Sequence, residues 1–259
     1  MSPRRSETIR TTLAALGCLL LLLPHGSIAT DSIGIGAILA KPGRLPADVA
    51  RDARSRPDVT LPMLNLKAGD RVADIFAGGG YYSELLAAIV GAAGEVLLVN
   101  NAAYMEFAGQ AIAARKRGRD IGPVTIHTRE AADLDLGENT LDAALIIMSY
   151  HDLYHVNEAE GWSEIDADDF LSQIATALKP GGRFLVVDHY AEPGSGSSAA
   201  QDLHRIDPEF AKRDIQQHGF RLVGESDVLR NPEDDHSVTV FDESVRGRTD
   251  RFILVFEKT

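Results

Sequence analysis

The fold is decided by the stretch Val72-Ala73-Asp74-Ile75-Phe76-Ala77-Gly78-Gly79-Gly80-Tyr81-Tyr82-Ser83. It begins as an apolar strand and passes through three glycines into a helix. Glycines at such a turn let the backbone approach a ligand without a Cβ in the way. Asp74, at the end of the strand, can hold backbone N–H groups or a cationic group of a ligand. The stretch therefore indicates a ligand-binding loop, with a tight turn that binds nothing as the alternative.

On both sides of this loop, predicted strands alternate with predicted helices. We expect strands at Arg71–Phe76, Gly94–Asn100, Val124–Thr128, Leu141–Met148, Arg183–Asp188, Arg221–Asp227 and Phe252–Glu257. Helices are expected at Ser83–Val90, Tyr104–Arg117, Asp168–Leu178 and Pro208–His218. The alternation predicts an α/β fold, with a doubly wound, mostly parallel sheet that helices cover on both faces. Such sheets bind ligands at the carboxyl ends of their strands.

Length and composition restrict the class of protein. The chain has 259 residues, of which 44% are apolar and 25% charged, as is typical of a globular protein with one domain. The formal net charge is −12, and no basic patch stands out in the body of the sequence. This balance argues against nucleic acid as the main partner.

The first 29 residues have the order of a secretory signal peptide. Three arginines precede an apolar run at 13–23, and Ser27-Ile28-Ala29 offers small residues for cleavage. The run is shorter than the roughly 20 residues that span a bilayer. We therefore expect export to the periplasm and no stable membrane insertion of the mature chain, which would begin at Thr30. An uncleaved anchor is the alternative, and Arg4-Arg5 leaves a twin-arginine route open.

Export also sets the expected domain boundaries. Cleavage after Ala29 would remove Cys18, the only cysteine, so the mature chain would have neither a disulfide nor a thiolate nucleophile. Residues 30–62 are rich in Gly, Pro and Arg, and they predict an arm with one short helix at about Ala47–Arg54. Residues 63–259 would then form the α/β domain.

The glycine loop and the landmarks after it resemble the class I S-adenosylmethionine-dependent methyltransferases. The loop is similar to the first motif of that family, an acid followed by alternating glycines. Gly94–Asn100 is similar to its second strand, and Leu178-Lys179-Pro180-Gly181-Gly182-Arg183 to the turn before its fifth. The resemblance covers about Lys67–Asp188. It implies a Rossmann-like, seven-stranded sheet in a single domain, mostly parallel with an antiparallel last strand.

The flanking segments resemble a narrower group of exported bacterial proteins that are predicted methyltransferases. These segments lie at 52–57, 150–155, 188–189, 203–207 and 241–252. With them, the resemblance covers nearly all of the mature chain. It implies transfer of a methyl group from S-adenosylmethionine to an unidentified small-molecule acceptor.

The resemblance also assigns a cofactor site. The residues at matching positions are Asp74, Gly78, Gly79, Gly80, Tyr81, Asn100, Glu130 and Ala131. Two positions depart from the family pattern: Phe76 replaces the first glycine of the motif, and Asn100 replaces the acid that binds the ribose hydroxyls. An amide lacks the charge-assisted strength of a carboxylate in that role. A structural turn cap is the alternative role for Asn100.

Histidines cluster at the expected ligand-binding edge. Tyr150-His151-Asp152 follows the fourth strand and Asp188-His189 follows the fifth, so both should meet the glycine loop at one cleft. We interpret His151 as a general base that Asp152 or Asp188 orients, because the pKa of histidine lies near working pH. A hydrogen-bonded structural role is the alternative for each. The candidate catalytic residues are His151, Asp152, Asp188 and His189.

Two further functions stay open at this point. His151 and His155 lie four residues apart and, with Asp188 or His189, could hold a divalent metal in a hydrolase or lyase. The changes at the two motif positions are also compatible with a periplasmic ligand-binding protein that has lost the chemistry. Calorimetry with S-adenosylmethionine separates methyl transfer from both, and metal analysis identifies the metal enzyme.

Overall fold

The computed structural model describes Met1 and residues 34–259 of the chain. The predicted signal sequence, apart from Met1, and its cleavage site after Ala29 lie outside the described residues. Within the described part, no helix is both long enough and apolar enough to cross a membrane.

Seven strands form one sheet within residues 34–259. They are β1 (Arg71–Ile75), β2 (Glu95–Asn100), β3 (Val124–Thr128), β4 (Leu141–Ile147), β5 (Leu178–His189), β6 (Phe220–Ser226) and β7 (Arg251–Lys258). Their order across the sheet is β3-β2-β1-β4-β5-β7-β6. The pairs from β3 to β5 are parallel, whereas β7 is antiparallel to both β5 and β6. The predicted Rossmann-like fold with an antiparallel last strand is confirmed.

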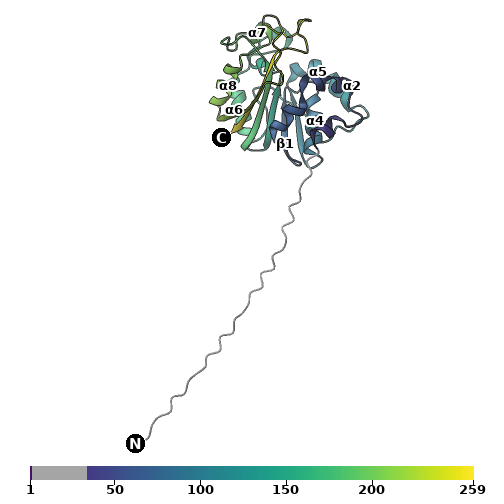
Figure 1. Ribbon diagram of the computed structural model, residues 1–259, viewed down its shortest axis with the longest axis vertical. Helices are drawn as coiled ribbons and strands as arrows, with labels where there is room; N and C mark the ends of the chain where they lie inside the picture. The colour runs from purple at the N-terminus through teal and green to yellow at the C-terminus, as the bar shows by residue number, and fades with distance from the viewer. Residues whose placement is uncertain (2–33) are drawn as a thin grey trace. The chain divides into compact units, whose positions relative to one another are not determined.

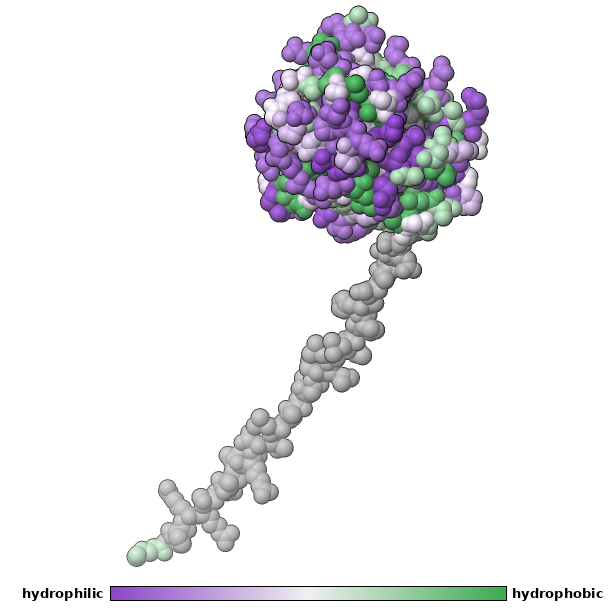
Figure 2. All heavy atoms as spheres, turned by 45° about the horizontal axis from the view of Figure 1, so that its top comes forward, coloured by the Kyte–Doolittle hydropathy of each residue, from purple (hydrophilic) through white to green (hydrophobic). Residues whose placement is uncertain are grey.

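Helices cover both faces of this sheet (Figure 1). α6 (Ala167–Ala177) and α8 (Pro208–Gln217) pack on one face, in a core that includes Ala73. α1 (Ile35–Leu39) and α4 (Tyr81–Val90) pack on the other, in a core that includes Val72. Neighbouring strand residues thus enter different cores, as expected for a sheet buried on both faces. The surface shown in Figure 2 is mostly hydrophilic, with hydrophobic side chains in small patches.

The predicted elements of the domain are all present, and their ends agree with the prediction within two residues except at the start of β5. That strand begins at Leu178 rather than at Arg183, because Leu178 already pairs with β4. The pairing register then shifts across the Lys-Pro-Gly-Gly sequence, where Gly181 has a φ of 77°. What the sequence indicates as a turn is therefore an irregularity within a longer strand.

The N-terminal arm is more structured than the sequence predicts. The expected short helix is present as α2 (Pro46–Ser55), and the arm also contains α1, α3 (Pro57–Thr60) and the 3-10 helix η1 (Leu61–Leu64). Asp52 of α2 connects the arm internally and to the body of the domain. Arg44 donates to Asp52, and Asp52 also accepts from the Tyr81 hydroxyl at 2.7 Å. The arm is therefore part of the folded domain and lies against the start of α4.

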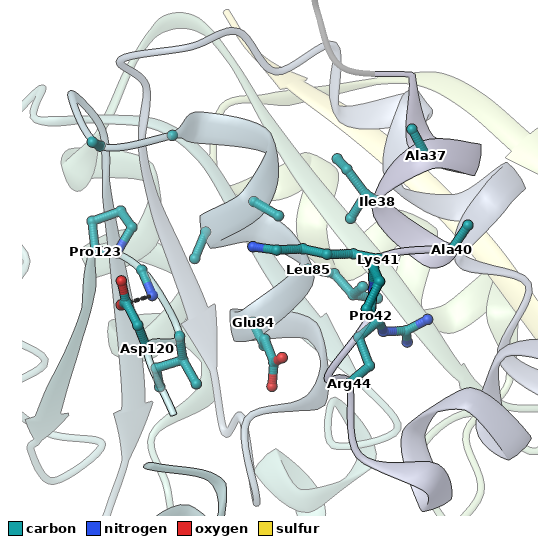
Figure 3. Close-up of a pocket in the computed structure, with 16 residues that line it drawn as sticks. Ala37, Ile38, Ala40, Lys41, Pro42, Arg44, Glu84, Leu85, Asp120 and Pro123 are labelled. Carbon is teal, nitrogen blue, oxygen red and sulfur yellow. Dashed lines mark hydrogen bonds between the residues drawn. The ribbon is translucent and has the colours of Figure 1, made fainter. Parts of the chain in front are cut away.

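A cavity of about 540 Å³ lies between α1, α4 and the loop that precedes β3 (Figure 3). Lys41, Glu84 and Asp120 line it, together with the apolar side chains of Leu85 and Pro123. This cavity lies towards the amino end of β3, whereas parallel sheets bind their ligands at the carboxyl ends of the strands. The functional site is therefore expected at the opposite edge of the sheet.

Candidate active site

The glycine loop connects the carboxyl end of β1 to α4. Two of its glycines, Gly78 and Gly80, have different structural roles. A Cβ at Gly78 would meet no atom within 4 Å, so the backbone there faces open space. A Cβ at Gly80 would lie 2.8 Å from Leu98 Cδ1, which is too close for any side chain. Both residues have left-handed φ angles, of 53° and 80°, that favour glycine. Gly78 thus leaves room for a ligand, and Gly80 permits close packing on β2.

Asn100 holds this loop from the end of β2. Its side chain is fully buried and makes a reciprocal pair with Gly78, in which Nδ2 donates to the carbonyl and Oδ1 accepts from the N–H, both at 3.0 Å. Arg115 of α5 (Ala102–Lys116) holds the next residue, because its Nε donates to the Gly79 carbonyl at 2.7 Å. The polar atoms of Asn100 are thus engaged with the backbone, as in the turn-cap alternative.

Four other residues assigned to the cofactor do not line the cavity beside the glycine loop, which is described below. They are Asp74, Tyr81, Glu130 and Ala131. Asp74 is buried and accepts from Ser83 Oγ at 2.6 Å, and burial raises the pKa of Asp74 to about 6. Tyr81 donates to an aspartate of α2. Glu130 accepts from the first N–H of α5 at 3.1 Å, and the Ala131 carbonyl accepts from a glutamine of α6 at 3.0 Å. Asp74 and Tyr81 thus support the elements on either side of the loop, whereas Glu130 and Ala131 contact other elements, α5 and α6.

A second cavity of about 540 Å³ opens at the carboxyl ends of β1, β4 and β5. Its wall includes Gly78-Gly79 from the loop, His151 and Asp152 from the turn after β4, and His189 from the end of β5. The structure thus brings together three groups from separate parts of the sequence. Asp188, the remaining candidate, is fully buried behind this wall and contacts His151.

His151 lies between two carboxylates. Its Nδ1 is 2.8 Å from Asp188 Oδ1, and its Nε2 is 3.2 Å from Asp152 Oδ1. Burial opposes a charge on the ring, but the two carboxylates outweigh it and raise the pKa of His151 to about 10. The ring is therefore protonated at neutral pH. The role of general base expected for His151 stays a prediction, and in this geometry both ring nitrogens face carboxylates.

The imidazolium of His151 keeps Asp152 ionised. Burial would favour the neutral acid, but the charge on His151 lowers the pKa of Asp152 well below its usual range. The Tyr104 hydroxyl donates to Asp152 Oδ2. Burial and this carboxylate raise the pKa of the phenol, so Tyr104 stays a donor. Asp152 thus places a negative charge in the wall of the cavity.

His189 is in the opposite electrostatic situation. Burial and the nearby charge of His151 lower the pKa of His189 well below its usual range, so the ring is neutral. Its Nδ1 lies 2.7 Å from Thr249 Oγ1, and its Nε2 has no hydrogen-bond partner among residues 34–259. An open nitrogen on a neutral imidazole can accept a proton, although the lowered pKa makes this ring a weaker base than an ordinary histidine. His189 is therefore the candidate base that this geometry favours.

Aromatic side chains close one side of the cavity. Phe76 stacks on Tyr104 and on Phe170, with ring centroids 4.8 Å and 5.5 Å apart. The residue that replaces the family's first glycine thus fills core space. Trp162 packs edge-on against Tyr104 at 5.2 Å, and Phe107 also lines the cavity. Sequence reasoning missed these wall residues, and the one local signal was that Trp162 is the only tryptophan in the chain.

Three further histidines come from the loops near this end of the sheet. His155 and His204 line the cavity, whereas His236 contacts an aspartate before β7 at 3.0 Å. The metal hypothesis placed His151 and His155 on one helix face. The chain instead forms a short 3-10 helix, η2 (His151–Tyr154), and Nδ1 of His155 faces a carbonyl of α7 (Ala200–Leu203) at 3.1 Å. His151 instead contacts Asp152 and Asp188.

Comparison with known proteins shows that the middle of the chain is similar to methyltransferases. Residues 73–186 match the family model described as "Methyltransferase domain". The chain is 28% identical over 152 residues to the ubiquinone/menaquinone biosynthesis C-methyltransferase UbiE of Pseudomonas paraeruginosa, which covers 56% of this chain and 52% of that protein. It is 28% identical over 177 residues to the protein of the same name from Teredinibacter turnerae, covering 64% and 63%. The chain thus spans about half the length of the first of these relatives.

Solved structures show the same fold. A SAM-dependent methyltransferase from Aquifex aeolicus superposes with a TM-score of 0.57 and 18% identity, covering 87% of this chain and 98% of that one. A methyltransferase from Mesorhizobium loti gives 0.56 and 13%, covering 80% and 100%. The [4+2]-cyclase SpnF gives 0.57 and 18%, covering 80% of each chain. At these identities the likeness concerns the fold alone.

Proposed function

We propose that the protein is a class I S-adenosylmethionine-dependent methyltransferase that transfers a methyl group to a small-molecule acceptor, because residues 73–186 match a methyltransferase family model. The cofactor of this domain is S-adenosylmethionine. The observation that carries the proposal is that the glycine loop, the ionised Asp152 and the neutral His189 share one cavity. This cavity lies at the carboxyl ends of parallel strands, where doubly wound sheets bind ligands.

The residues of the cavity fit this cofactor in three respects. The open space beside Gly78 lets the backbone approach a ligand closely. The carboxylate of Asp152 complements a cationic ligand, and S-adenosylmethionine carries a sulfonium and an ammonium group. The volume of about 540 Å³ is in the ordinary range for small-molecule sites. When bound, the cofactor supplies an electrophilic methyl group.

In this proposal, the chain's own residues position the acceptor and handle its proton. His189 accepts that proton at Nε2, since this nitrogen is open and the ring is neutral. His151, fixed by Asp188, keeps Asp152 charged and holds the turn after β4 in place. Because the displacement requires alignment of the reacting atoms, positioning supplies much of the acceleration.

Calorimetry on the full chain tests cofactor binding. We expect S-adenosylmethionine and S-adenosylhomocysteine to bind to the wild type, and Gly78→Ala to weaken both strongly, because its methyl group would enter the space beside the loop. Gly118→Ala is the matched control: Gly118 also has a left-handed φ, of 66°, and open surroundings, but it follows α5 away from the cavity. No binding to the wild type, or equal binding to both variants, contradicts the proposal.

A further inference from the structure

Four arginines line a cavity of about 470 Å³ that adjoins the active site. They are Arg51, Arg54, Arg246 and Arg251, and no acidic side chain belongs to the lining that the structure describes. The sequence brings them from two distant segments, α2 and the residues around the start of β7. The local charge is thus opposite to that of the chain, whose formal net charge is −12.

These arginines have no acidic partners. Within residues 34–259, none of the four lies within 4.0 Å of a carboxylate. Arg251 is 7% exposed, and its guanidinium donates only to the carbonyls of Arg54 and Thr249, at 2.6 Å and 3.3 Å. Asp250, its neighbour in the chain, is engaged by other cations, Arg230 and His236.

Burial of a charge without a counter-charge is unfavourable. Burial lowers the pKa of Arg251, and the positive charges of Arg51 and Arg54 act in the same direction, against smaller raising effects of Tyr82 and Asp250. Among residues 34–259, no carboxylate lies within 4.0 Å of its guanidinium to balance this charge. A bound anion would do so, and guanidinium groups pair with carboxylate and phosphate in two parallel hydrogen bonds. The arginine cavity therefore has the charge and the donors of an anion site.

The arginine cavity and the active-site cavity share part of their walls. Arg51, Met148, His189 and Phe241 line both. A ligand anchored among the arginines would thus lie beside the candidate base. We propose that the methyl acceptor carries a carboxylate or phosphate group that binds in the arginine cavity while its reacting atom lies near His189. The acceptor role of this ligand rests on the proposed methyl transfer.

The cofactor has a carboxylate of its own, and the two sources can be told apart. Arg51 lines both cavities, whereas Arg54 and Arg246 line the arginine cavity and not the active-site cavity. Substitution of Arg54 or Arg246 should therefore affect an acceptor anion and leave cofactor binding unchanged. Both side chains belong to exposed residues, so glutamine at either position should preserve the fold.

The test is calorimetry on the full chain, with inorganic phosphate and S-adenosylhomocysteine as separate probes. We expect phosphate to bind to the wild type, and Arg54→Gln and Arg246→Gln each to weaken it about tenfold or more, since each removes a charge-assisted contact. Affinity for S-adenosylhomocysteine should stay at the wild-type value. Arg213→Gln is the matched control, because Arg213 is an exposed arginine on α8 outside both cavities. Thermal melts verify that each variant is folded.

The outcomes separate this inference from the proposed function. Phosphate that fails to bind to the wild type, or that binds equally to all variants, overturns the anion site. Weaker binding of S-adenosylhomocysteine to Arg54→Gln or Arg246→Gln also overturns it, because the cavity would then hold the cofactor's carboxylate. If the wild type binds phosphate through these arginines but does not bind S-adenosylhomocysteine, the anion site is supported and methyl transfer is contradicted.

Discussion

Asn100 uses both ends of its amide, and a carboxylate cannot replace it. Asn100→Asp would restore the acid of the family pattern, but it would also set a carboxylate oxygen against the Gly78 carbonyl in a fully buried place. We expect a loss of about 1–3 kcal/mol in the free energy of unfolding, the usual cost of an unsatisfied buried group. Urea unfolding measures it.

The adjacent residue supplies the control for this substitution. Asn101 caps α5, where its Oδ1 accepts from the Tyr104 N–H at 2.9 Å. Aspartate serves as well as asparagine at such a position. Asn101→Asp should therefore be nearly neutral. An equal loss in both variants would show that added charge, and not the lost donor, causes the effect.

The charge on His151 predicts how stability depends on pH. Its folded pKa of about 10 lies above the ordinary value of 6.5, so the stability it contributes is complete below about pH 6.5. That stability is lost as the pH rises towards 10, because in this range the folded ring keeps its proton while the unfolded ring gives it up, so rising pH favours unfolding. We expect the Tm of the wild type to fall across this window. Asp188 and Asp152 provide the attraction.

His151→Gln should remove this pH dependence. At pH 6.5 the variant should be less stable than the wild type, because two buried carboxylates lose their cation, and the difference should shrink towards pH 10. His218→Gln, whose ring lies on the α6 and α8 side of the sheet, should keep the wild-type profile. A parallel fall in wild type and His151→Gln would contradict the assignment of the charge.

At the scale of the element, the glycine loop is a strained connection with two separable functions. From the sequence, substitution at Gly78 or Gly80 is expected to abolish binding with little loss of fold. The structure revises this expectation for Gly80, whose φ of 80° and contact with Leu98 leave no room for a side chain. Gly80→Ala should therefore lower the free energy of unfolding by about 1–3 kcal/mol, the cost of a strained backbone residue, with any clash added to it. Denaturant melts check this, and wild-type stability in Gly80→Ala would contradict it.

At the scale of the whole molecule, we propose that the chain is exported. The basic start, the apolar run and the small residues before Thr30 support cleavage by a signal peptidase. We predict that the exported protein begins at Thr30, and N-terminal sequencing of the periplasmic fraction measures this directly. An intact Met1 on protein confined to the cytoplasm would contradict it.

The sequence by itself determined the order of the elements and the edge of the sheet that holds the site. The apolar periodicities of β1, β4 and β5 are local, so they can be read without knowledge of the rest of the chain. Because parallel sheets bind ligands at the carboxyl ends of their strands, the sequence predicts that Gly78, His151 and His189 belong to the site. Their convergence on one cavity follows from topology, which the strand and helix pattern already contains.

Only the tertiary structure decided what these side chains do. The charge state of His151 depends on Asp188, which is 37 residues away, and the role of Asn100 depends on the backbone of another loop. The arginine cavity joins residues near 51 to residues near 251. A pKa or a hydrogen bond is set by neighbours in space and by burial, and neither quantity is encoded in local periodicity. The sheet could therefore be predicted from the sequence, whereas the electrostatics of the site could not.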